Sequence, residues 1–295
     1  MFLSYRAGEA SSTPITFTSI LTTIAMFEYD FMRNAFAAAG LAAIVSGVVG
    51  YFLVLRGQTF AGHALGHVGF AGATGAVLLG FAPIWGLVAV TVAGGIAMGF
   101  LGERISGRDV AIGIVLSLSL GFGLLFLHYY TAFAAQATAL LFGNVLAVDR
   151  PTIGILLGLA VITLMGLATI LRPLVFASLQ PELAEAKGVP LRFVSTAFLA
   201  IVAIAVAESV QVVGILLVFS LMVGPPATAQ RLTTELRSGV ALSAGLALAE
   251  AWLGIAVAYY TDWPASFCIA ALSALGFFAT RGRYWIHRQR AQLIS

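Results

Sequence analysis

Two histidines, His63 and His67, stand in an apolar stretch rich in glycine and alanine that runs from Gly57 to Gly80. On a helix, residues four positions apart leave the same face about one turn from each other, so both imidazoles would point the same way. Ionisable groups at membrane depth are costly and usually face a cavity, a partner or a ligand. Neutral imidazoles at this spacing suit a borderline-soft divalent cation such as zinc. The pair is therefore either a metal contact or two rings that hydrogen-bond neighbouring helices.

The composition places this pair in a membrane protein. Of the 295 residues, 60% are hydrophobic and 9% are charged, with a mean hydropathy of +1.02, whereas soluble domains carry about 25% charged residues. We therefore expect an all-α polytopic membrane protein. The single cysteine, Cys268, excludes a disulfide within the chain and a cysteine-rich metal cage. No long run of like charges indicates nucleic-acid binding.

Nine hydrophobic segments can form the helices that position the histidines, and together they define a transmembrane domain over residues 34–280. Residues 1–33 are expected to form an N-terminal tail and an interfacial helix, and residues 281–295 a basic cytoplasmic tail. Ala134–Val148 is shorter and contains Leu-Phe-Gly-Asn, which favours a re-entrant or broken helix over a span. The expected spans are approximately 34–55, 60–80, 83–101, 110–129, 152–171, 191–209, 212–230, 239–260 and 264–280.

The distribution of basic residues supports nine spans. With the N-terminus outside, every lysine and arginine except Arg6, Arg33 and Arg150 falls on the cytoplasmic side, as the positive-inside rule requires. A tenth span at Ala134–Val148 would instead place the loop 172–192 and the basic C-terminus outside.

The longest polar connection, Arg172–Leu191, contains a short predicted helix on the cytoplasmic face. Pro181 suits the first helical turn, and Glu182 lies near the positive end of the helix dipole. Gly188 then ends the helix after about two turns. This element is either a plain connection or a docking element for a soluble subunit.

Polar or helix-breaking residues also occur inside three of the expected spans. Pro225 and Pro226 remove two backbone donors and predict a break, which either lines a transport path or serves packing. Glu250, in the middle of the eighth span, is either a path-lining carboxylate or a protonated donor between helices. Glu208 and Asp262 fall near outer ends of spans, where solvent or a binding protein could meet them.

Several segments, in order between about Phe27 and Thr280, resemble the integral-membrane permease subunits of ABC importers for zinc, manganese and iron(II). No single motif is decisive, and the resemblance rests on the ordered set. The family's Asp-x-x-x-His helix reads His63-Ala-Leu-Gly-His67 here. The other matching segments are 47–56 (GVVGYFLVLR), 141–144 (LFGN), 181–189 (PELAEAKGV), 211–218 (QVVGILLV), 225–229 (PPATA) and 262–265 (DWPA).

The resemblance implies a multi-pass protein of the bacterial inner membrane that forms a homodimer around a central path. It also implies two ATP-binding subunits below and an extracytoplasmic metal-binding protein above, with the transported ion not bound permanently. The chain has no phosphate-binding loop of the Gly-x-x-x-x-Gly-Lys-Ser/Thr type, so we expect ATP hydrolysis on a separate chain and no catalytic residues here. The implied coupling helix that seats on the ATPase contains Pro181, Glu182, Ala184, Glu185, Lys187 and Gly188.

Replacement of the family's aspartate by His63 favours zinc over manganese, because imidazole suits zinc and carboxylate suits manganese. Manganese and iron(II) remain alternatives. A proton-coupled secondary transporter could use the two histidines and Glu250 as proton relays instead. An intramembrane zinc protease is disfavoured, because its motif needs a glutamate directly after the first histidine and Ala64 occupies that position.

Overall fold

The computed structural model describes residues 28–101, 105–129, 141–143 and 145–294, and within these ranges every regular element is a helix. This confirms the all-α prediction. Most of the expected N-terminal tail and interfacial helix lies outside the described residues, as do positions 134–140 and 144 of the expected re-entrant segment. The helices are α2 (Asp30–Leu55), α3 (Thr59–Leu78), α4 (Pro83–Leu101), α5 (Ile105–Tyr129), η2 (Val145–Ala147), α7 (Arg150–Leu179), α8 (Pro181–Ala186), α9 (Leu191–Val213), α10 (Ile215–Leu232), α11 (Leu236–Thr261) and α12 (Ala265–Ile294).

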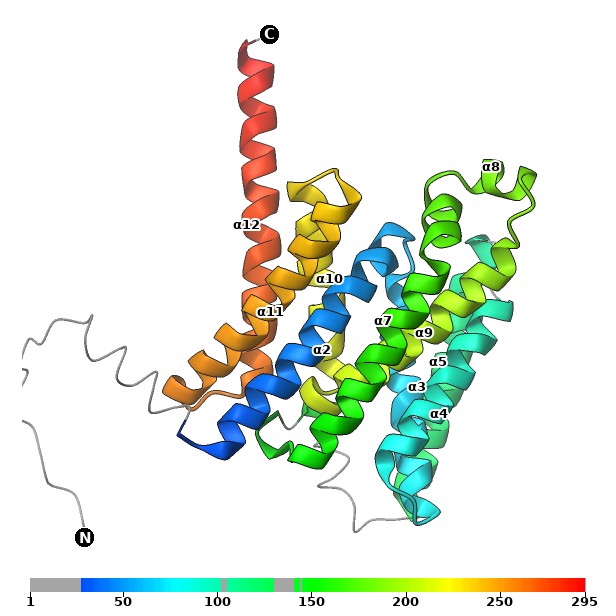
Figure 1. Cartoon of the computed structure of the whole chain (residues 1–295), viewed down its shortest axis with the longest axis vertical. Helices are drawn as coiled ribbons and strands as arrows, with labels where there is room; N and C mark the ends of the chain where they lie inside the picture. The colour runs from blue at the N-terminus through cyan, green and yellow to red at the C-terminus, as the bar shows by residue number, and fades with distance from the viewer. Residues whose placement is uncertain (1–27, 102–104, 130–140, 144, 295) are drawn as a thin grey trace, which may run out of the picture.

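Each of the nine expected spans coincides with one long helix. Six helices contain a stretch long and apolar enough to cross a membrane: α2, α4, α5, α7, α9 and α11. The protein is therefore a multi-pass membrane protein. That α3, α10 and α12 also cross, which would make nine spans, stays a prediction. Residues 281–294 of the expected basic tail continue α12 as a helix, whose C-terminal end lies at the same end of the bundle as α8 (Figure 1).

Helix α7 is longer than predicted. The expected span ended at residue 171, but the helix continues through Pro173 to Leu179. A proline inside a helix removes one backbone donor, and here the buried side chains of Leu174 and Ala177 hold the following turns against the bundle. The prediction that the polar loop begins at Arg172 was therefore wrong. The connection between α7 and α8 is a single residue, Gln180.

The predicted break at Pro225 and Pro226 was also wrong, because α10 is continuous through both prolines. Pro226 cannot donate to the carbonyl of Met222 four residues earlier. Gly50 of α2 packs directly on this carbonyl, so closely that a Cβ at position 50 would overlap its oxygen. The neighbouring backbone thus covers a group that would otherwise lack a partner inside the membrane.

The break lies instead at Gly214, the one residue between α9 and α10. Gly214 has φ +83°, and Gly143 of the Leu-Phe-Gly segment, with φ +79°, packs against it backbone to backbone. A side chain at either position would overlap the backbone of the other segment. Glycine is needed at both positions, because L-residues with side chains rarely adopt this conformation.

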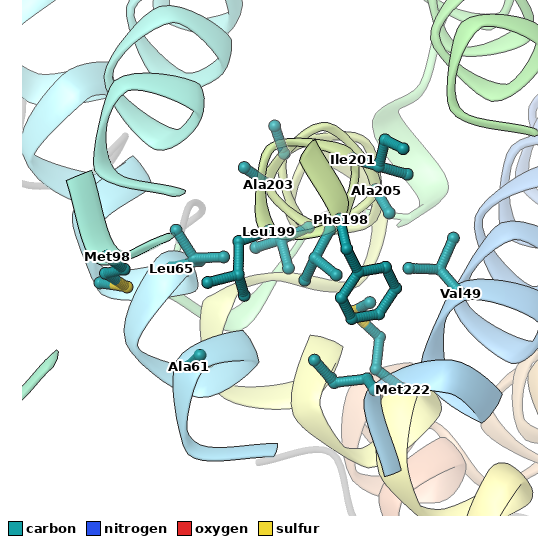
Figure 2. Close-up of a cluster of buried hydrophobic side chains, with 14 of the residues drawn as sticks. Val49, Ala61, Leu65, Met98, Phe198, Leu199, Ile201, Ala203, Ala205 and Met222 are labelled. Carbon is teal, nitrogen blue, oxygen red and sulfur yellow. The ribbon is translucent and has the colours of Figure 1, made fainter. Parts of the chain in front are cut away.

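Helices α2 and α9 form the interior of the bundle. Of the six apolar spans they are the most buried, with 72% and 67% of the residues in an 18-residue apolar stretch of each helix buried. Figure 2 shows α9 surrounded by side chains from its neighbours, with Leu65 of α3 and Met98 of α4 on one side and Val49 of α2 on the other. A hydrogen bond of 2.8 Å between the hydroxyls of Ser46 and Ser209 joins the two inner helices. Helices α11, α2 and α7 lie side by side in front of α9 and α10 (Figure 1).

Candidate metal-transit site

The two histidines lie on one face of α3, as their spacing predicted. Their ring centroids are 4.9 Å apart and the rings meet edge to face at 81°. The ring of His63 also contacts the ring of Phe219 on α10, at 5.3 Å between centroids. Both histidines are half-buried, whereas most of the other side chains in the first four turns of α3 are buried.

Neither imidazole hydrogen-bonds a neighbouring helix within the described residues. The Nδ1 atom of His67 is buried and has no hydrogen-bond partner there. The interpretation that the two rings hold helices in register by hydrogen bonds therefore finds no support. What the arrangement offers is two ring nitrogens on one accessible face, which is the donor set of a borderline divalent cation.

This donor set is incomplete within one chain. Among the described residues, no group of three or more histidine, cysteine, aspartate or glutamate side chains could hold a metal ion. Two nitrogens leave at least two coordination positions of a tetrahedral ion open. Water or a second copy of the chain would have to supply them, and such partial coordination suits an ion that must leave again.

The other predicted path residues are buried, unlike this pair. Pro225 and Pro226 are buried within α10. Glu250 is 8% exposed on α11 and faces α12, where its carboxylate lies beside Ser273 and Gly276. This placement favours the interhelical interpretation of Glu250 over the path-lining one.

Glu208 corrects one expectation and Asp262 agrees with another. We expected solvent or a binding protein to reach Glu208, but its side chain is fully buried, because α9 lies inside the bundle. Neither of its carboxylate oxygens has a hydrogen-bond partner in the part of the chain that the structure describes. Asp262 is exposed directly after α11.

The predicted cytoplasmic helix is present as α8, which begins at Pro181 and ends at Ala186. Ala184 is fully buried and anchors the helix against the bundle, while the other predicted coupling residues are exposed: Pro181, Glu182, Glu185, Lys187 and Gly188. Sequence reasoning missed that large apolar side chains are exposed around them. Leu179, Leu183 and Phe193 are 62%, 46% and 67% exposed, so this end of the molecule presents an apolar patch as well as charges.

A polar cluster that sequence reasoning also missed connects the end of α7, next to α8, to the start of the histidine helix. Arg56, in the turn before α3, donates to the hydroxyl of Ser178 on α7 at 3.1 Å and to Gln58 at 3.4 Å. Its guanidinium also lies 5.6 Å from the ring centre of Phe198 on α9. Gln58, directly before α3, reaches Ser195 on α9 at 3.5 Å. In the sequence, the cluster is indicated by Arg56 and Gln58, two polar residues in the turn between two apolar helices.

Comparison with known proteins agrees with these observations. A model of the ABC 3 transport family matches residues 28–281. The manganese transport system membrane protein MntC of Halalkalibacterium halodurans is 30% identical over 270 residues, covering 88% of this chain and 92% of that protein. The manganese import system permease protein ScaB of Streptococcus gordonii is 28% identical, covering 86% and 92%. Among solved structures, PsaBC from Streptococcus pneumoniae in complex with Fab superimposes with a TM-score of 0.79 at 26% identity, covering 89% of this chain and 95% of that one.

Proposed function

The chain belongs to the ABC 3 transport family and is a permease of a metal ABC importer, and we propose that it passes zinc along a path that includes His63 and His67. The observation that carries the proposal is that both imidazoles are half-buried on one face of α3 without a hydrogen bond to another helix. Ionisable side chains at membrane depth are costly and usually serve function.

In this proposal the permease acts as a homodimer in the bacterial inner membrane. Two copies of the histidine pair meet at the axis and offer the ion four ring nitrogens. Two separate ATP-binding subunits seat on α8, with Leu183 supplying apolar contact beside Glu182 and Glu185. An extracytoplasmic protein delivers the metal on the other side. The polar cluster around Arg56 connects α7, α9 and the start of α3, which gives ATP-driven movement at α8 a route to the histidines.

Manganese is the second candidate, because two relatives at 28–30% identity are named as manganese permeases. The choice between the metals depends on position 63. An imidazole softens the site and favours zinc, while the carboxylate usual in the family suits manganese. The substitution His63→Asp should therefore move the preference of the transporter toward manganese.

The test is uptake of zinc and of manganese into proteoliposomes that contain the permease, its ATP-binding subunit and the binding protein. We expect zinc to be preferred by the native chain, and His63→Asp to reverse the ratio. The double variant His63→Ala/His67→Ala should lose uptake of both metals while the ATP-binding subunit still co-purifies. His128→Ala is the matched control, because His128 is an exposed histidine at the far end of α5. Undiminished transport by the double variant would refute the site. If the native chain prefers manganese and His63→Asp leaves this preference unchanged, the choice of zinc is refuted.

A further inference from the structure

A groove on the outside of the bundle has no role in the proposed transport path. It lies between α7 and α11, which both pack on α2, and it encloses about 390 Å³. Val48 and Phe52 of α2 form its floor, Leu167 and Leu171 of α7 one wall, and Val240 of α11 part of the other. Figure 1 shows α2 between these two helices on the face nearest the viewer. The volume falls in the range of about 300–1,000 Å³ that small-molecule sites occupy.

The groove begins at one surface of the membrane and extends inward. Its lining on α11 starts at Leu236, the first residue of that helix, and ends at Ala244, a distance of about 12 Å at ~1.5 Å per residue. The lining on α2, Val48 and Phe52, lies in the last third of that helix, toward Arg56, and the lining on α7 lies in its second half, from Leu164 to Leu171. This is the end that the basic residues predict to be cytoplasmic. The groove therefore lies in the cytoplasmic half of the bundle, with Arg237 near the membrane surface, where a headgroup would lie, and apolar lining further in, where an acyl chain would lie.

One charged side chain lines this otherwise apolar groove. Arg237 stands at its mouth, and within the part of the chain that the structure describes it forms neither an ion pair nor a hydrogen bond. Arg33 and Arg150, by contrast, both pair with Asp30, on a different part of the molecule. A second arginine, Arg172, directly follows the lining residue Leu171 on the opposite wall. The arginine at the mouth of the groove needs an anion, and the apolar groove itself fits an apolar chain. An anionic phospholipid supplies both in one molecule.

We propose that this groove binds one anionic phospholipid of the cytoplasmic leaflet. The guanidinium of Arg237 binds the phosphate, since arginine donors match phosphate oxygens in pairs. An acyl chain lies on Val48 and Phe52 between the two walls. The bound lipid fills the space between α7 and α11, so it supports α2, one of the two inner helices, from outside.

The experiment is native mass spectrometry of the full-length permease in detergent, titrated separately with phosphatidylglycerol and with phosphatidylcholine. The native chain should bind phosphatidylglycerol more tightly. Arg237→Ala should weaken phosphatidylglycerol binding about fivefold, the effect of one arginine near a membrane surface, and leave phosphatidylcholine binding unchanged. Arg237→Lys should retain most of the preference because it keeps the charge.

Two further variants separate a lipid site from general damage. Ala241→Phe fills the groove from a position that is already exposed, and it should reduce binding of both lipids. Arg281→Ala removes an exposed arginine of α12 that is not among the residues lining the groove, and it should change nothing. Equal binding of the two lipids by the native chain, or native-like phosphatidylglycerol binding by Arg237→Ala, would overturn the proposal. So would loss of a permease dimer in Ala241→Phe with lipid binding intact, which would assign the groove to a second copy.

Discussion

Two of the regions in which polar side chains enter the helix bundle differ in the packing around those side chains. On the face that α3 shares with α10, His63 and His67 are half-buried, and the ring of His63 contacts the rings of His67 and Phe219. Between α2 and α9, Ser46 and Ser209 are fully buried and bonded to each other, and Glu208 beside them is fully buried as well. Both regions contain ionisable side chains, but only the histidines are partly exposed. The exposure of a side chain, more than its capacity to carry charge, therefore distinguishes a group that can bind a passing ion from one that serves helix packing.

The largest expected effect concerns the tightly packed region. Gly50→Val places a side chain against the backbone carbonyl of Met222, which cannot move without displacing α10. We expect a loss of about 3 kcal/mol or more of stability, at or above the upper end of ordinary overpacking. Thermal unfolding of the purified permease in detergent measures it.

Gly245→Ala is the matched control, because this helical glycine of α11 has open space where a Cβ would lie. It should be neutral or stabilise by up to about 1 kcal/mol. If the Gly50→Val variant unfolds at the same temperature as the native chain, the interior of the bundle is more loosely packed than the contact with Met222 indicates.

The sharpest test of the comparison replaces one residue of each region by the same amide. His67→Gln should reduce metal uptake at least about tenfold, as loss of a group at a metal site does, and leave thermal stability nearly unchanged. Glu208→Gln keeps the volume of the buried side chain and removes its capacity for charge, so we expect uptake within about twofold of native. Uptake and unfolding temperature are measured on both variants. The opposite pattern, with Glu208→Gln inactive and His67→Gln active, would reverse the assignment.

A smaller effect is expected at the connection between the two ends of the proposed path. Arg56→Ala removes the hydrogen bonds to Ser178 and Gln58 and should cost about 1–2 kcal/mol, since a charged donor is lost from a partly buried site. If this cluster carries movement from α8 to α3, metal uptake per ATP hydrolysed should fall more than ATP hydrolysis itself. Arg56→Lys should restore only part of the coupling, because lysine lacks the planar fork. Uptake and hydrolysis that fall in proportion would show a role in stability alone.

The smallest effect lies outside the membrane, at the start of α7. Thr152 donates its backbone N–H to the carboxylate of Asp149 at 3.1 Å, and hydrogen bonds from Thr152 lower the pKa of Asp149. A carboxyl group with a lowered pKa stabilises the fold above its ordinary value of about 3.9, and this contribution disappears as the pH falls through the lowered pKa. Asp149→Ala should therefore lower the unfolding temperature slightly at neutral pH and not at strongly acidic pH. A difference that persists in acid would mean that the cap does not act through the carboxylate.

Sequence predicted the helices and the histidine pair because both depend on local information. A hydrophobic stretch between polar residues predicts a helix, and four-residue spacing places His63 and His67 on one face. The errors arose where a distant segment decides the outcome. Pro225 and Pro226 predict a break by local rules, but Gly50, far away in sequence, covers the carbonyl that the helix leaves free. Glu208 was expected to be accessible near a span end, and the burial of α9 by its neighbours could not be deduced from its own residues.

The contact between Gly143 and Gly214 has a consequence for how this family can vary. Each glycine occupies the space that a side chain at the other would need, and both backbones have positive φ. Neither site can accept a new residue alone, and an inserted residue on either side would move the α9–α10 corner away from its partner. Over evolutionary time these two positions should change together or not at all.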